Sequence, residues 1–127
     1  MLSNTLSLSS SERWKASLGA LLCLAACGLL LRSLPLDAHW LLAPVGASVV
    51  ILFVQFHSPL AQPWPLLGSY LFATATGLAC SHWVTQPILA AALAVALTIW
   101  LMAWLNCVHP PGGALALLLV LNGPYSN

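Results

Sequence analysis

The chain has 127 residues, of which 61% are hydrophobic and only 4% are Asp, Glu, Lys or Arg. An ordinary soluble domain carries roughly 25% charged residues, so this composition excludes a soluble globular protein, whereas a surface that faces lipid accommodates apolar side chains. The net charge of +1 provides no strong field for nucleic acid. We therefore expect an all-α integral membrane domain that contacts the lipid bilayer and has no nucleic-acid partner.

The hydropathy pattern predicts a polar N-terminal tail over residues 1–13 and a transmembrane domain over residues 14–127. Four apolar stretches of 17 to 19 residues are just long enough to span about 30 Å of hydrocarbon as helices. A fifth stretch of ten residues reaches half that distance and predicts a half-helix. In chain order, the stretches are residues 16–34, 40–56, 66–84, 88–105 and 112–121.

The few charged residues indicate an orientation. Arg13 and Lys15 precede the first stretch and Arg32 follows it, which favours a cytoplasmic N-terminus. We expect the chain to lie in a bacterial inner (plasma) membrane.

Small residues recur every four positions in the third stretch, at Ser69, Ala73, Gly77 and Ser81. Such a stripe lets a neighbouring helix backbone approach closely. Because four helices and a fragment leave little room to enclose a pathway, we also expect a homo-oligomer, most simply a dimer.

The segment from Cys107 to Ala114 contains the most informative motif. Two prolines, Pro110 and Pro111, cannot lie inside a helix without breaking it, and Gly112 and Gly113 follow directly. The segment therefore predicts an unwound stretch that leads into the N-terminus of a short helix. Non-helical backbone at membrane depth survives only where protein or water covers it.

A related motif occurs earlier, where Pro44-Val45-Gly46-Ala47 matches Pro111-Gly112-Gly113-Ala114 as Pro-x-Gly-Ala. If all stretches span, the two copies have opposite orientations, as in the inverted repeats of transporters. The match rests on three identities, so a chance match is the alternative.

Two helix N-termini near the membrane midplane would attract a small anion without any Lys or Arg. The alternative is a pair of proline kinks that only shape the bundle. The candidate anion-binding residues are Pro44, Gly46, Ala47, Ser48, Asn106, His109, Pro110, Pro111, Gly112, Gly113 and Ala114.

Three of these candidates have polar side chains. His109 is a candidate anion donor or pH gate, and the alternative is a histidine bonded to backbone. Asn106 either lines the same cavity or bonds between helices. Ser48 either presents its hydroxyl to the site or bonds back to its own helix.

The motifs resemble those of the HPP family of integral membrane proteins. Residues 109–114, His-Pro-Pro-Gly-Gly-Ala, resemble the family signature, and residues 43–48 and 58–63 resemble two further family blocks in the same order. The resemblance covers about residues 14–121, and Val45 stands where an aromatic residue is usual. It implies four transmembrane helices and, from some plant plastid and cyanobacterial members, nitrite transport. It also implies that the chain is short or truncated, because family members continue with a further hydrophobic stretch.

The helices contain no carboxylate pair, nucleophile–base set or metal-binding motif, so we expect no enzyme, metal or cofactor. Two functional hypotheses follow. The first is a small-anion transporter or channel, with nitrite as the leading substrate. The second is a non-transporting structural membrane subunit or a truncated, inactive chain.

Overall fold

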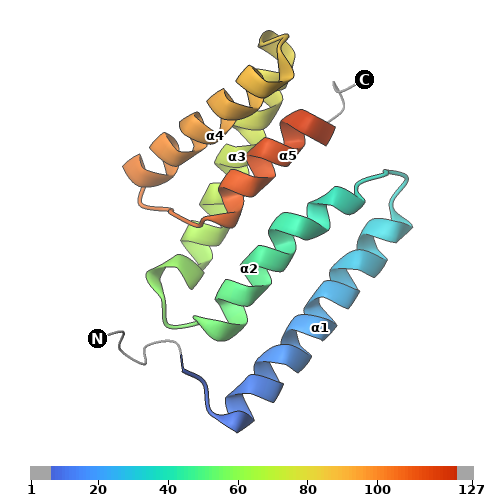
Figure 1. Ribbon diagram of the computed structural model, residues 1–127, viewed down its shortest axis with the longest axis vertical. Helices are drawn as coiled ribbons and strands as arrows, with labels where there is room; N and C mark the ends of the chain where they lie inside the picture. Colours follow the sequence, from blue (N-terminus) through green and yellow to red (C-terminus); the bar gives the residue numbers. More distant parts are fainter. Residues whose placement is uncertain (1–6, 123–127) are drawn as a thin grey trace.

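The computed structural model describes residues 7–122, which form five α-helices and two short 3-10 helices and contain no strand. Figure 1 shows the helices running alternately up and down, so that α2 and α5 run in opposite directions. In chain order, the elements are α1 (Ser10–Ser33), η1 (His39–Leu41), α2 (Leu42–Val54), η2 (Pro59–Ala61), α3 (Pro63–Trp83), α4 (Pro87–Trp104) and α5 (Pro111–Asn122).

Local sequence explains where several helices begin and end. The Ser9 hydroxyl accepts a hydrogen bond from the Glu12 amide, and the Glu12 carboxylate accepts one from the Ser9 amide, which together form a capping box at the start of α1. Helix α1 ends just before Pro35, as a following proline favours. Helices α3, α4 and α5 each begin with a proline, a position where the missing N–H carries no penalty.

The predicted stretches correspond to the observed helices, with shifts at their ends. Helix α1 begins at Ser10, so the predicted tail over residues 1–13 includes its first turn, and residues 1–6 lie outside the described part. The capping box accounts for this earlier start. Helix α2 has only 13 residues, because η1 takes up the start of the predicted stretch.

The prediction of four spanning helices is only partly supported. By length and composition, α1 with 24 residues and α4 with 18 are long and apolar enough to cross a membrane. Helices α2 and α5, with 13 and 12 residues, extend only about 18–20 Å. Spanning by α2 and α3 remains a prediction, as does the inverted repeat.

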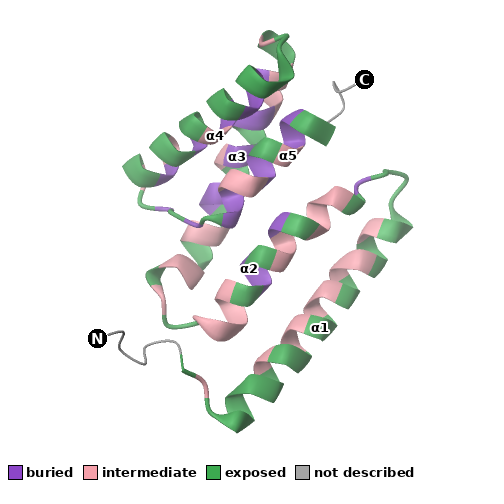
Figure 2. Ribbon diagram, viewed as in Figure 1, coloured by how far each residue is buried: buried purple, intermediate pink, exposed green. Residues whose placement is uncertain are grey.

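The core lies between α3, α4 and α5, which pack closely against one another. Figure 2 shows the buried residues concentrated on these helices, whereas α1 has none. The predicted small-residue stripe lies in this core, where Ser69 and Ala73 are fully buried and a Cβ on Gly77 would lie 3.0 Å from the Cβ of Leu119. The close approach predicted from the stripe is thus confirmed, with α5 as the neighbour.

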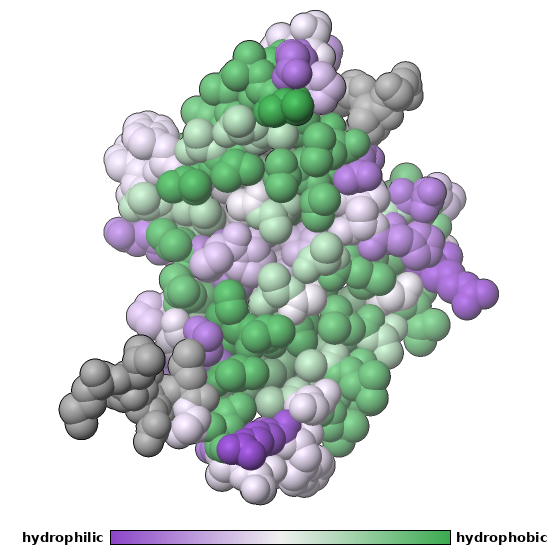
Figure 3. Space-filling view, in the orientation of Figure 1, coloured by the Kyte–Doolittle hydropathy of each residue, from purple (hydrophilic) through white to green (hydrophobic). Residues whose placement is uncertain are grey.

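The molecule therefore has two parts. Helix α1 packs against α2 as a helical hairpin, and contacts between α2 and α5 help to join this hairpin to the three-helix core. The surface in Figure 3 is largely apolar, with its most hydrophilic atoms towards the periphery. Large apolar side chains such as Leu21, Leu22 and Leu29 are more than 60% exposed on α1, as expected for a helix that faces lipid.

Candidate functional site

The segment between α4 and α5 is unwound, as the two prolines predicted. Helix α4 ends at Trp104, and Asn106 then adopts a left-handed conformation with φ of 54°, which Asn tolerates better than most residues. The chain turns inward, so that Cys107 and His109 are both fully buried. Pro111 then begins α5.

Both ring nitrogens of His109 have hydrogen-bond partners from distant parts of the chain. Nδ1 lies 2.8 Å from the backbone oxygen of Leu60, next to α3, and Nε2 lies 2.8 Å from the hydroxyl oxygen of Ser48, on α2. Because a carbonyl only accepts, Nδ1 carries a proton and donates it to Leu60. His109 therefore links α2 and η2 to the start of α5.

The chain of contacts continues to α3 through Tyr70. The Tyr70 hydroxyl contacts the Ser48 hydroxyl and lies 3.0 Å from the backbone oxygen of Pro44, to which it donates. Its ring meets the His109 ring edge-on, with 5.9 Å between the ring centroids and 86° between the planes. We call His109, Ser48 and Tyr70, with the Leu60 and Pro44 carbonyls, the His109 network.

Every buried polar side-chain atom of the network has a hydrogen-bonding neighbour. Among the described residues, no buried side-chain nitrogen or oxygen atom lacks a hydrogen-bond partner. A buried polar group without a partner would cost about 1–3 kcal/mol, so the network stabilises this arrangement of helices. His109 bonds to backbone, as the alternative interpretation of this residue predicted. The Ser48 hydroxyl instead contacts His109 and Tyr70, which lie outside its own helix.

Two amides at the N-terminus of α5 already donate hydrogen bonds within the chain. The Gly112 amide donates to the His109 carbonyl over 2.9 Å, and the Gly113 amide donates to the Pro110 carbonyl over 3.0 Å. Pro110 and Pro111 have no amide hydrogen to offer. An anion at this helix end would therefore depend on the helix dipole and on His109 more than on these two amides.

The two glycines at matching motif positions share one property. A Cβ added to Gly46 or to Gly113 would meet nothing within 4 Å, whereas one added to Gly112 would lie 2.9 Å from the Cβ of Ser69. The backbone at Gly46 and Gly113 is thus approachable from one side, and Gly112 is the glycine required by helix packing.

The remaining predicted residues lie around the network. Pro44, Ser48, His109, Pro111 and Gly112 are buried, and Gly113 and Ala114 are half-buried. Ala47, Asn106 and Pro110 are exposed, and Asn106 serves as the turn residue that ends α4.

The groove beside the network is apolar. It has a volume of about 320 Å³ and extends from Tyr70 towards α1. Its lining residues are Cys27, Leu30, Leu31, Leu41, Pro44, Val45, Tyr70 and Leu115. No group of three His, Cys, Asp or Glu side chains gathers within residues 7–122, and the expectation of no metal remains a prediction.

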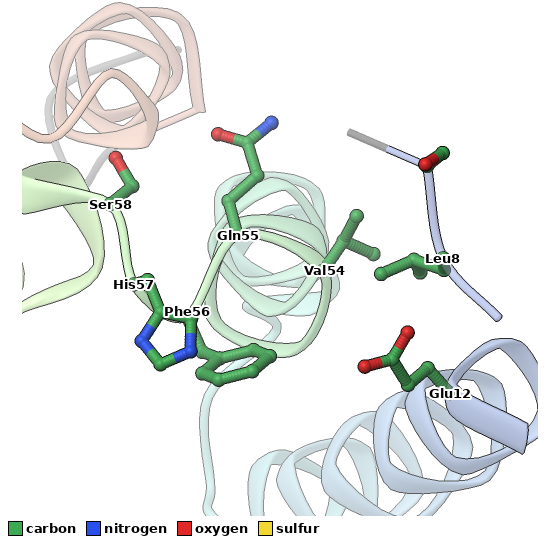
Figure 4. Close-up of a pocket in the computed structure, with 8 residues that line it drawn as sticks. Leu8, Glu12, Val54, Gln55, Phe56, His57 and Ser58 are labelled. Atoms are coloured by element: carbon green, nitrogen blue, oxygen red, sulfur yellow. The ribbon is translucent and has the colours of Figure 1, made fainter. Parts of the chain in front are cut away.

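A more polar pocket of about 430 Å³ lies elsewhere, where the start of α1 meets the end of α2. Figure 4 shows the Glu12 carboxylate pointing from α1 towards this end of α2. The hydrogen bond from the Ser9 backbone N–H holds the pKa of Glu12 below its usual value. This carboxylate is therefore committed to capping α1.

Comparison with known proteins identifies the family. The family model for the transmembrane region of HPP proteins matches residues 6–127. The chain belongs to this HPP family. Its HPP domain is similar to a transmembrane protein of Dictyostelium discoideum, at 39% identity over 114 residues, which covers 85% of this chain and 39% of that protein.

A second Dictyostelium discoideum transmembrane protein is 37% identical over 90 residues, which covers 68% of this chain and 29% of that protein. The chain thus spans less than two fifths of the length of these relatives. No solved structure matches it. These similarities establish an HPP membrane protein.

The three segments that resemble HPP family blocks lie apart in the sequence but converge on the His109 network. Residues 43–48 provide Ser48 and the Pro44 carbonyl, residues 58–63 provide the Leu60 carbonyl, and residues 109–114 provide His109. Tyr70 lies outside all three blocks and was not predicted as a site residue. The sequence offered one signal for Tyr70 as a site residue, namely its place near the start of α3, seven residues after Pro63.

Proposed function

We propose that this HPP domain carries a small anion across the membrane, with nitrite as the leading substrate. The observation that supports the proposal most directly is the convergence of the three HPP blocks on one buried polar network. The network lies where the α1–α2 hairpin meets the three-helix core. A contact between two such parts is a natural place for a pathway that opens and closes.

The charge distribution determines how an anion would be held. No Lys or Arg follows Arg32 in the sequence, so the positive potential that attracts an anion comes from the N-terminus of α5, and His109 offers its ring N–H as a hydrogen-bond donor. In this proposal the hairpin moves away from the core, Ser48 separates from His109, and the anion binds beside His109. The approachable backbone at Gly46 and Gly113 forms part of its path.

We further propose that the chain acts as a homodimer in a bacterial inner membrane with its N-terminus in the cytoplasm. The five helices within residues 7–122, two of them short, leave little space for an enclosed pathway. The exposed leucines of α1 provide an apolar face that a second copy or lipid would cover. Crosslinking in native membranes that recovers only monomer would contradict the dimer.

The transport proposal is tested by anion flux into proteoliposomes, with nitrite, nitrate and chloride compared for the wild type. Gly46→Leu and Gly113→Leu place a bulky side chain in space that is open beside each glycine. His109→Ala removes the imidazole ring. Gly28→Leu is the matched control, because its surroundings on α1 are also roomy and it lies outside the HPP blocks. Saturable nitrite flux that is lost in the three site variants and kept in Gly28→Leu is the expected result.

The alternative function is a structural membrane subunit that transports nothing. Two observations favour it: each buried polar side-chain atom of the network already has a partner within the protein, and the adjacent groove is lined almost entirely by apolar residues. Absence of flux for all three anions, from protein shown to be folded, would overturn the transport proposal in favour of this one.

A further inference from the structure

The His109 network is a chain of three groups between two acceptors. In order, the contacts join the Leu60 carbonyl to His109, His109 to Ser48, Ser48 to Tyr70, and Tyr70 to the Pro44 carbonyl. Both ends are backbone oxygens, which have no proton to give. We propose that this network is a proton-binding site, at which an additional proton is held between His109 and Ser48.

The proposal follows from counting protons. Each of the four contacts needs one hydrogen, and neutral His109, Ser48 and Tyr70 supply one each. In the neutral state, one of the four contacts therefore has no hydrogen, and the lone pairs of its two atoms point at each other. If Tyr70 donates to Pro44 and Ser48 donates to Tyr70, the unfilled contact lies between Ser48 and His109.

An additional proton on Nε2 of His109 completes the chain. His109 then donates from Nδ1 to Leu60 and from Nε2 to Ser48, Ser48 donates to Tyr70, and Tyr70 donates to Pro44. All four contacts are filled, and those of the imidazolium are charge-assisted, which makes them stronger than neutral hydrogen bonds. The cost is the burial of a positive charge, which the ordered acceptors offset.

The surroundings provide few competing titratable groups. Helices α2, α4 and α5 contain no Asp, Glu, Lys, Arg, His, Cys or Tyr within their bounds. Tyr70 on α3 is already part of the network, the buried Cys107 precedes His109 by two residues, and Cys27 of α1 lines the groove beside Tyr70. The five charged residues of the chain all precede α2, and neither ring nitrogen of His109 bonds to one of them.

This inference deepens the proposed function, and it rests on that function only in naming the proton as a co-transported ion. A monovalent anion beside a protonated His109 forms a neutral pair, and moving a neutral pair through the membrane avoids much of the cost of burying a lone charge. Proton binding itself depends only on the network.

The test measures protonation of His109 without any anion present. Protein labelled with ¹⁵N-histidine is placed in lipid nanodiscs and studied by NMR. The His109 signals are assigned by their loss in His109→Gln, and the chemical shifts of the two ring nitrogens are followed as the pH is changed. Tyr70→Phe removes the contacts of the Tyr70 hydroxyl with Ser48 and with the Pro44 carbonyl. In this variant neutral His109 donates to Leu60 and Ser48 donates to His109, so both remaining contacts have a hydrogen without an additional proton. At any one pH at which both forms are detected, the ratio of doubly to singly protonated His109 should fall roughly tenfold in this variant.

Two further variants keep the test decisive. Ser48→Ala leaves His109 bonded to Leu60 and Tyr70 bonded to Pro44, but it removes the acceptor for a proton on Nε2 of His109. It should therefore also lower the ratio, which keeps the test available if Tyr70→Phe folds poorly. Thr98→Val is the control, because it removes a buried hydroxyl that pairs with Thr76 outside the network. Equal ratios in the wild type and both network variants would overturn the proton site.

Proton flux separates this inference from the transport proposal. Nitrite flux without proton movement, together with the expected NMR result, would keep the proton site and reject only its coupling to transport. The expected NMR result from protein that transports no anion would keep the proton site and reject the transport proposal.

Discussion

His109 Nε2 lies 2.8 Å from the Ser48 hydroxyl oxygen, although the two residues are 61 positions apart in the sequence. The contact joins the α1–α2 hairpin to the segment that begins α5, and it does so in the interior of a chain with few polar groups. In the described part of the chain, Tyr70 also joins the hairpin to the core through Ser48 and the Pro44 carbonyl. With so few polar contacts between the two parts, the loss of one should be measurable.

Ser48→Ala should destabilise the fold by about 1–3 kcal/mol, because it leaves Nε2 of His109 buried without its partner. Ser81→Ala is the matched control, since the Ser81 hydroxyl only bonds back to Gly77 on its own helix. SDS-driven unfolding in mixed micelles measures both variants. Equal losses in the two would show that the contact contributes nothing specific.

Adjacent glycines should respond differently to alanine. Gly112→Ala should cost about 1–3 kcal/mol, because its Cβ would lie 2.9 Å from the Cβ of Ser69 and 3.3 Å from the Ser69 backbone oxygen. Gly113→Ala meets open space and should be neutral or stabilising by up to about 1 kcal/mol. The same unfolding measurement compares them, and a reversed order would contradict the packing of α5 against α3.

The turn at Asn106 should tolerate glycine better than alanine. With φ at 54°, Asn106→Ala should cost about 1–2 kcal/mol, because a Cβ disfavours the left-handed conformation. Asn106→Gly should be close to neutral. Thermal unfolding in detergent is the measurement, and a loss in the glycine variant as large as in the alanine variant would point to a role for the Asn side chain itself.

The first turn of α1 should loosen in acid. Because the pKa of Glu12 in the folded chain lies below its ordinary value of 4.5, its contribution to the cap is fully present above pH 4.5 and is lost as the pH falls through the folded pKa. Protection of the amides at the start of α1 against hydrogen exchange, measured relative to the unstructured chain at the same pH, should therefore fall in that acidic range. Glu12→Gln also caps the helix but does not titrate, so its protection should not show this fall.

The sequence predicted the helices well because each signal is local. Prolines at Pro63, Pro87 and Pro111 coincide with helix starts, and the stripe through Ala73 and Gly77 indicated the close packing of α3. The earlier start of α1 was missed because the hydropathy pattern does not register the capping box that Ser9 and Glu12 form at the polar end of the helix.

The candidate site was predicted in its parts but not in its connections. Pro44, Ser48 and His109 were all identified from motifs, yet no local pattern shows that Ser48 meets His109 or that Leu60 provides the second acceptor. Tyr70 was missed because a single aromatic residue on an apolar helix resembles an ordinary packing residue. Such long-range contacts depend on how α2 and α3 are placed against the break before α5.

The contact between Ser48 and His109, on which the His109 network depends, is tested most directly by a double-mutant cycle. Ser48→Ala, His109→Leu and the combined variant are compared with the wild type by SDS-driven unfolding in mixed micelles. A direct contact predicts a coupling free energy of about 0.5–3 kcal/mol between the two positions. Additive losses, with a coupling free energy near zero, would contradict the network and the account of the site built on it.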